Sequence, residues 1–223
     1  MELNRLKRVV KSVVRDNPVA YKRLARLYTF RDPHVLQRYF SIRMAKDSRF
    51  DESELAMASL CPTAILDAVI ERWNPRTFLD IGCGTGQAME YLSLRDIECT
   101  GLEGSIAAIK VSSMAKHIHC VNLNKYVNLG RKYDVVWSYE VAEHIHPKYV
   151  DNFLLTLTGH GDVLVMSAAQ PGQGGTGDFN EQPASYWIDK VKEHGMSFDD
   201  KFSEYLHSLP EYFSRNMMAF IRI

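Results

Sequence analysis

Hydrophobic positions divide the C-terminal three quarters of the chain into short apolar runs separated by longer amphipathic segments. Runs of about five apolar residues, typical of buried strands, begin near residues 77, 98, 134 and 162. Each is followed by a segment whose apolar positions recur every three or four residues, as in a helix with one buried face. This alternation predicts an α/β fold, a doubly wound sheet with helices on both sides.

The pattern gives approximate bounds for each element. The predicted strands are 77–81, 98–102, 118–121, 134–138, 162–168, 197–199 and 216–223. The predicted helices are 61–73, 87–94, 105–115, 147–158, 182–194 and 201–213. Asn74 precedes Pro75, and because proline disfavours helical backbone in the residue before it, the first of these helices is expected to end there.

The first 60 residues differ from the rest in pattern and in charge. They contain three predicted amphipathic helices (2–15, 19–28 and 33–44), and residues 1–50 hold 13 Lys and Arg against 4 Asp and Glu, a net charge of +9. Residues 51–223 hold 14 against 23, a net charge of −9. We therefore expect a basic helical extension at 1–60 and a separate domain at 61–223. The basic face is either solvated surface or a site for RNA, phosphorylated sugar or anionic lipid.

Other features of the whole chain exclude several protein classes. No apolar run approaches the ~18 residues of a membrane span, and the apolar residues near the N-terminus alternate with Arg and Lys, unlike a signal peptide. The four cysteines (Cys61, Cys83, Cys99 and Cys120) lack the C-x-x-C spacing of zinc or redox sites. They are expected to be reduced thiols, and the location to be cytoplasmic.

A glycine-rich turn follows the first predicted strand. Asp80 ends the apolar run, and Gly82, Gly84 and Gly86 alternate with small residues before a helical pattern begins. Glycine permits sharp turns and lets the backbone approach a ligand closely, so the turn is expected to hold a nucleotide. The dinucleotide pattern G-x-G-x-x-G/A does not fit, because its third position is Gln87.

Asp80 and the three glycines form the segment D-x-G-x-G-x-G, and a second predicted strand ends at Glu103, 17 residues after Gly86. This combination resembles motif I and its partner acid in the class I S-adenosylmethionine (SAM) methyltransferases. The resemblance covers about residues 61–223. It implies a seven-stranded sheet of order 3-2-1-4-5-7-6 with strand seven antiparallel, and SAM as cofactor. Asp80 would face the methionine ammonium, and Glu103 would accept hydrogen bonds from the two ribose hydroxyls.

The carboxyl ends of the strands supply the remaining implied cofactor contacts. The carbonyl near Ser138 would take the SAM ammonium, and Asn122 would accept from the adenine amine where the family often has an acid. A plain turn remains the alternative for Asn122. The implied cofactor residues are Asp80, Gly82, Cys83, Gly84, Gly86, Glu103, Gly104, Ser105, Asn122, Leu123 and Ser138.

The fourth strand is followed by an E-x-x-E-H motif, Glu140, Glu143 and His144. It resembles ubiquinone-pathway O-methyltransferases and small-RNA 2′-O-methyltransferases in which matching residues bind a divalent metal. Three interpretations stay open. In the first, a Mg²⁺ or Mn²⁺ ion is bound by Glu140, Glu143, His144 and Asp178. In the second, His144 acts as general base without a metal while Glu140 orients the acceptor. In the third, the motif is structural.

A glycine-rich run at 170–180, which contains Asp178, resembles a segment of small environmental and glycan-cluster methyltransferases and is expected to form a lid. No N-P-P-Y tetrad follows strand four, which favours an oxygen acceptor over an amine. The prediction is SAM-dependent O-methylation of a small molecule or glycan. The alternatives are an RNA 2′-O-methyltransferase that uses the basic extension, and a SAM-binding module without catalysis.

Overall fold

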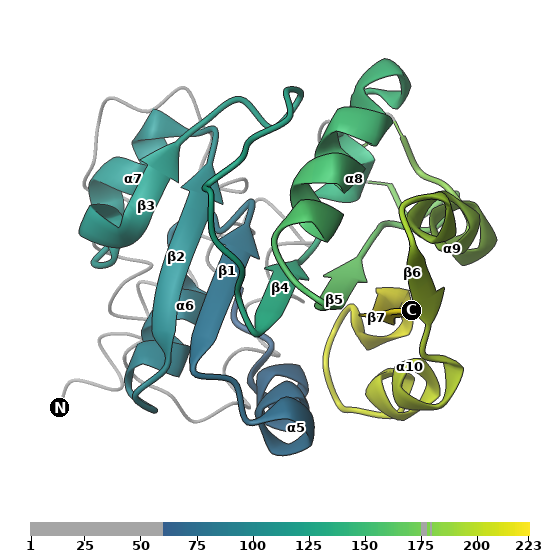
Figure 1. Ribbon diagram of the computed structural model, residues 1–223, viewed down its shortest axis with the longest axis horizontal. Coiled ribbons are helices and arrows are strands. Elements are labelled where there is room, and N and C mark those ends of the chain that lie inside the picture. The colour runs from purple at the N-terminus through teal and green to yellow at the C-terminus, as the bar shows by residue number, and fades with distance from the viewer. Residues whose placement is uncertain (1–59, 175–177, 179) are drawn as a thin grey trace, which may run out of the picture.

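The computed structural model describes residues 60–174, 178 and 180–223. Within them a seven-stranded sheet has the order β3-β2-β1-β4-β5-β7-β6 (Figure 1). Neighbouring strands are parallel except around β7, which is antiparallel to both β5 and β6. The predicted fold class, strand order and direction of the last strand are therefore confirmed. Residues 1–59 of the predicted basic extension lie outside the described residues.

The strand bounds agree with the hydrophobic pattern to within about two residues. The strands are β1 (Thr77–Ile81), β2 (Glu98–Glu103), β3 (Ile118–Cys120), β4 (Val135–Ser138), β5 (Val163–Ser167), β6 (Met196–Phe198) and β7 (Met217–Arg222). The α-helices are α5 (Thr63–Trp73), α6 (Gln87–Ser93), α7 (Ile106–Val111), α8 (Val150–Gly159), α9 (Ala184–Glu193) and α10 (Asp200–His207). Two 3₁₀ turns matter for the site: η2 (Ala142–His144) and η4 (Ser214–Asn216).

Two predicted helices are too long, and local chemistry explains each. The helix predicted at 105–115 ends at Val111, where the Ser112 hydroxyl accepts a hydrogen bond from the Met114 N–H at 3.0 Å and turns the chain away. The helix predicted at 201–213 ends at His207. Pro210 lies three residues later, and a proline there cannot donate the helical hydrogen bond that continuation requires.

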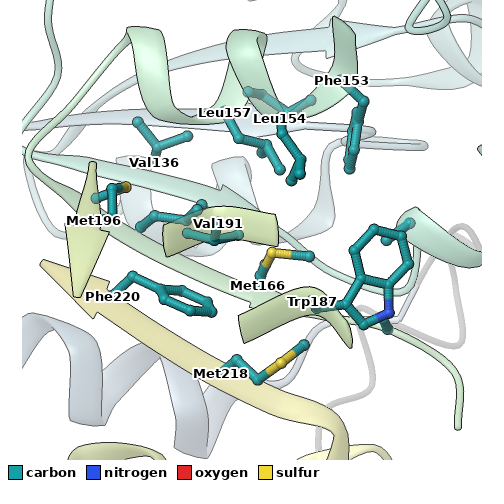
Figure 2. Packing of buried hydrophobic residues seen from close by; sticks show 14 of the residues in the cluster. Val136, Phe153, Leu154, Leu157, Met166, Trp187, Val191, Met196, Met218 and Phe220 are labelled. Atoms are coloured by element: carbon teal, nitrogen blue, oxygen red, sulfur yellow. The ribbon is translucent and has the colours of Figure 1, made fainter. Parts of the chain in front are cut away.

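Side chains alternate between two buried clusters, one on each face of the sheet. Along β1, Leu79 joins the cluster that packs under α8 and α9, whereas Phe78 joins the cluster under α5, α6 and α10. Figure 2 shows the first cluster, with Phe153, Leu154 and Trp187 packed toward Met166 of β5. Because both faces are covered, the central strands are apolar throughout, as the sequence pattern required.

The strand order places β1 beside β4, with β2 on one side and β5 on the other. Strands β2 and β3 are added on one side of β1 and strands β4 and β5 on the other, so the strand order changes direction between β1 and β4, and open α/β sheets bind ligands beyond the carboxyl ends of the strands at such a point. The glycine turn and the E-x-x-E-H motif leave the sheet at these two ends and meet there. No helix among the described residues is long and apolar enough to cross a membrane.

Candidate active site

The glycine turn after β1 passes directly under the motif that follows β4. Gly82 has φ +79°, and a Cβ added there would lie 2.3 Å from Cγ2 of Val141. Gly86 has φ +77° and its added Cβ would lie 2.9 Å from the Ser112 hydroxyl. These two positions therefore require glycine for both backbone conformation and space. The two predicted motifs are in contact, through Val141.

Glu103 connects the glycine turn to the end of β2. Its carboxylate accepts a hydrogen bond from the Gly84 N–H at 2.8 Å and another from the Ser105 N–H at 2.6 Å. The Ser105 hydroxyl in turn accepts from the Ala108 N–H at 3.1 Å and caps α7. The carboxylate is thus fixed at the strand end, and since each oxygen has a second lone pair it can still accept from a ribose hydroxyl.

Asp80 lies buried beneath the turn, with only 3% of its surface exposed. Burial raises the pKa of Asp80 to about 8, and the nearby Glu103 carboxylate adds to the effect. No cation among the described residues offsets this shift. A buried carboxyl of this kind is stabilised as a carboxylate when a positive group binds next to it.

The other predicted cofactor residues take several positions. The Ser138 hydroxyl donates to the Ile81 carbonyl at 2.9 Å, which ties β4 to β1. Asn122 is exposed, and its side-chain oxygen accepts from the Asn124 N–H at 3.0 Å, so the turn considered for this segment does form. Cys83 points into the core, and Leu123 packs against the cluster under α8. Cys83 can therefore contribute only backbone groups.

These residues fit the SAM implied by the sequence. Glycine keeps the turn free of side chains, Asp80 lacks a cation, and Glu103 ends the neighbouring strand with two acceptor oxygens. SAM carries a sulfonium, an ammonium and two ribose hydroxyls. Asp80 would hold the ammonium end, and Glu103 the ribose.

The E-x-x-E-H motif divides its side chains between the interior and the surface. The η2 turn directs Glu143 inward, where it is 2% exposed and its Oε2 finds no hydrogen-bond partner among the described residues. Burial and, secondarily, the Glu140 carboxylate raise the pKa of Glu143 to about 8. His144 instead lies at the surface, with 46% of its side chain exposed. His144 is therefore the most exposed of the three, Glu140 is partly exposed, and Glu143 is buried.

Glu140 has a strained backbone, and its carboxylate is bound by side chains from two other segments. Its φ is +54°, unusual for a residue other than glycine. Its two carboxylate oxygens accept from the Asn216 amide at 3.0 and 3.3 Å, and one also accepts from the Gln173 amide at 3.1 Å. Burial raises the pKa of Glu140, although these hydrogen bonds oppose the shift. The carboxylate therefore joins three segments of the site.

The four candidate metal ligands lie in one region but do not form a metal site among the described residues. No group of three or more His, Cys, Asp or Glu side chains that could hold a metal ion occurs among the described residues. Glu140 contacts Asn216 and Gln173, Glu143 is buried, and His144 pairs with Asp178, whose Oδ1 lies 3.3 Å from its Nδ1. Of the three interpretations of the motif, the one with a bound Mg²⁺ or Mn²⁺ is therefore not supported by the arrangement of these residues.

Several contacts of the site had no signal in the sequence. Asn180 donates from its backbone to the Glu143 carbonyl at 3.0 Å and from its side chain to the Ile145 carbonyl at 2.9 Å. Asn216, the last residue of η4, donates to Glu140 across 76 residues of sequence. Asn180 belongs to the glycine-rich run that the sequence singles out, but its bonds to the turn after β4 were not predicted. Asn216 is an ordinary polar residue outside any motif.

Comparison with known proteins agrees with this geometry. Residues 79–160, which run from the glycine turn through the E-x-x-E-H motif to the end of α8, match the family model described as a methyltransferase domain. This segment of the chain is therefore similar to methyltransferase domains. The matched residues include Asp80, Glu103 and His144.

The methyltransferase domain has both sequence and structural relatives. A mitochondrial ubiquinone biosynthesis O-methyltransferase of Arabidopsis thaliana is 30% identical over 100 residues, covering 40% of this chain and 31% of that protein. The match thus spans about a third of the relative's length. A sugar N-methyltransferase from Streptoalloteichus superposes with TM-score 0.59 at 17% identity, over 82% and 91% of the two chains.

A SAM-bound amino pentose methyltransferase from Micromonospora echinaspora has the same fold, with TM-score 0.60 at 14% identity over 80% of this chain and 99% of that chain. A SAM-bound magnesium protoporphyrin IX methyltransferase from Synechocystis superposes with TM-score 0.56 at 16% identity, over 84% and 90%. At these identities the likeness concerns the fold, and it extends beyond the residues matched by the family model.

Proposed function

We propose that this protein is a SAM-dependent methyltransferase that methylates a hydroxyl oxygen of a small molecule or glycan. The observation that carries the proposal is the buried Asp80 beneath a turn that only glycine can form, next to Glu103 at the end of the adjacent strand. SAM, when bound, supplies an electrophilic methyl group. The protein's contribution is to position cofactor and acceptor and to remove the acceptor's proton.

Each residue has a distinct role in this proposal. Asp80 holds the ammonium group as a carboxylate, and the backbone amides of the glycine turn hold the methionine carboxylate. Glu103 accepts from the ribose hydroxyls while retaining the Ser105 N–H. His144, exposed beyond β4, accepts the proton of the acceptor hydroxyl. The buried Glu143 lies behind it and shapes the floor of the site.

Two points support an oxygen acceptor. A hydroxyl group must lose its proton when it is methylated, and His144 is placed to accept that proton. The Arabidopsis relative is an O-methyltransferase by name. The RNA alternative depends on residues 1–50, which the structure does not describe. Around His144 the described acidic residues Glu140, Glu143 and Asp178 would repel a polyphosphate backbone. An uncharged acceptor that carries hydroxyl groups would not be repelled by these acidic residues.

The first experiment measures cofactor binding by isothermal titration with S-adenosylhomocysteine and SAM. Asp80→Asn should weaken SAM binding roughly 10- to 100-fold, the range expected for losing a charge-assisted hydrogen bond. Asp189→Asn, an exposed substitution of the same kind on α9, should leave the affinity unchanged. Equal affinity of Asp80→Asn and wild type would show that the cofactor lies elsewhere.

The second half of the experiment follows transfer of labelled methyl groups to a panel of sugars, phenols and other hydroxylated compounds. His144→Gln should keep SAM affinity and lose transfer by about 10²- to 10⁴-fold, as expected for a general base. Tight SAM binding without any product across the panel would instead indicate the binding module without catalysis.

A further inference from the structure

We propose that Asp178 is a positioning residue that fixes the imidazole of His144 with its proton on Nδ1 and its lone pair on Nε2. This inference rests on the proposed function, because it explains how His144 is prepared to accept a proton. Asp178 comes from the glycine-rich run between β5 and α9, whereas His144 ends the η2 turn. No sequence motif links the two residues.

The pair has the geometry of a histidine oriented by a carboxylate. Asp178 Oδ1 lies 3.3 Å from His144 Nδ1. The Asp178 side chain is only 9% exposed, whereas the His144 side chain is 46% exposed. The carboxylate is therefore on the protein side of the ring. Since an ionised carboxylate accepts hydrogen bonds but cannot donate one, a proton shared between the two groups at this distance belongs to Nδ1, and the lone pair of the neutral ring then lies on Nε2.

The contact depends on Asn180, two residues after Asp178. The Asn180 backbone N–H donates to the Glu143 carbonyl and its side-chain amide donates to the Ile145 carbonyl, so that both groups hold it against the turn containing His144. Asn180 is 1% exposed, and Gln182 donates to its remaining oxygen at 3.3 Å. Asp178 is thereby placed over His144 by a buried and fully bonded anchor.

The step that this arrangement serves balances in atoms and charge. As the acceptor oxygen forms its bond to the methyl carbon, the S–CH₃ bond breaks and its electron pair stays on sulfur, which yields S-adenosylhomocysteine. The hydroxyl proton moves to Nε2 of His144, and the imidazolium that forms is stabilised by the Asp178 carboxylate. The imidazolium then releases its proton to solvent.

The test reads the tautomer of His144 directly, without substrate. Long-range ¹H–¹⁵N NMR of protein labelled at histidine, recorded near pH 8.5 where an ordinary histidine is neutral, distinguishes a protonated Nδ1 from a protonated Nε2. The His144→Gln variant identifies the signal. In the wild-type protein His144 should be protonated on Nδ1, whereas most exposed histidines in water favour Nε2.

Substitution at Asp178 should then change the tautomer. In Asp178→Asn the side-chain amide can donate to Nδ1, so the proton should move to Nε2; in Asp178→Ala the ring should become a mixture dominated by the Nε2–H form. Asp189→Asn is the matched control and should leave His144 protonated on Nδ1. A wild-type ring protonated on Nε2, or a tautomer unchanged in both variants, would overturn the proposal.

Measuring cofactor affinity separately from the tautomer of His144 distinguishes failure of this inference from failure of the proposed function. Asp178→Asn should bind S-adenosylhomocysteine with wild-type affinity, because Asp178 is not among the residues to which cofactor binding is assigned. With an acceptor in hand, kcat should fall while KM stays the same. If the tautomer shifts as expected but SAM does not bind, the pairing stands and the proposed methyl transfer fails; the reverse outcome rejects the pairing alone.

Discussion

Among single residues, Asp80 is the carboxyl group whose shifted pKa bears most directly on cofactor binding. Its pKa of about 8 means that the carboxyl is mostly protonated at pH 7 in the free protein. Bound SAM would place a positive charge beside it and favour the carboxylate. Cofactor binding should therefore be coupled to the release of a proton from Asp80.

This coupling can be measured by titrating SAM at pH 7 in two buffers with different ionisation enthalpies. The wild-type protein should release about one proton per SAM bound, because Asp80 changes from protonated to ionised. Asp80→Asn has no proton to lose there and should release close to none, at ligand concentrations high enough to saturate its weaker site. Proton uptake by the wild type, or equal release by both proteins, would contradict the assigned state of Asp80.

At the scale of secondary-structure elements, the junction of β4, β7 and the glycine-rich run holds the site together. Asn216 donates to both oxygens of Glu140 and also to the Gln173 side-chain oxygen at 2.8 Å. Glu181 accepts from the Gly172 and Gly174 N–H groups at 2.7 and 2.6 Å. The described part of the run is thus bonded to the body of the domain at two places.

Asn216→Ala should lower the free energy of unfolding by about 1–3 kcal/mol, because the buried Glu140 carboxylate loses its main donor. Hydrogen exchange in residues 170–174 should become faster. Asn128→Ala removes a comparable side-chain bond at an exposed position, to the Gly130 N–H, and should cost less than about 0.5 kcal/mol. Urea unfolding monitored by circular dichroism measures both; equal costs would show that the junction is not stabilising.

For the whole molecule, the buried acids should make stability depend on pH in an unusual direction. The pKa values of Asp80 and Glu143 are both raised to about 8, far above the value of roughly 4 expected for the unfolded chain. The folded protein therefore binds more protons than the unfolded one between about pH 4 and pH 8. The stability that these protonated acids permit is complete below pH 4 and is lost as the pH rises through 8.

The expected result is that the ligand-free protein melts at a lower temperature at pH 8.5 than at pH 6. In the double variant Asp80→Asn, Glu143→Gln the difference should be smaller, because two uncharged side chains replace the ionising acids. Asp189→Asn should follow the wild type. Differential scanning fluorimetry across this range is sufficient. A double variant with the same pH dependence as wild type would mean that other groups control it.

Local patterns in the sequence were enough to predict most of the sheet and the cofactor turn. Strand positions follow from runs of apolar residues, since a strand buried on both faces must be apolar throughout. The glycine turn, Asp80 and Glu103 could be predicted from the sequence because backbone sterics and charge act over a few residues. Helix ends were predicted less well, as at Ser112, where one hydroxyl decides the outcome.

Only the tertiary structure decided what the individual acids do. Nothing local distinguishes Glu140, held by Asn216, from Glu143, which is buried, or indicates that Asp178 lies next to His144. These states depend on which distant segments return to the same strand end and on how much water they exclude. A sequence determines such long-range contacts only through the complete fold, because hydrogen bonding and burial depend on distances in space and not on distances along the chain.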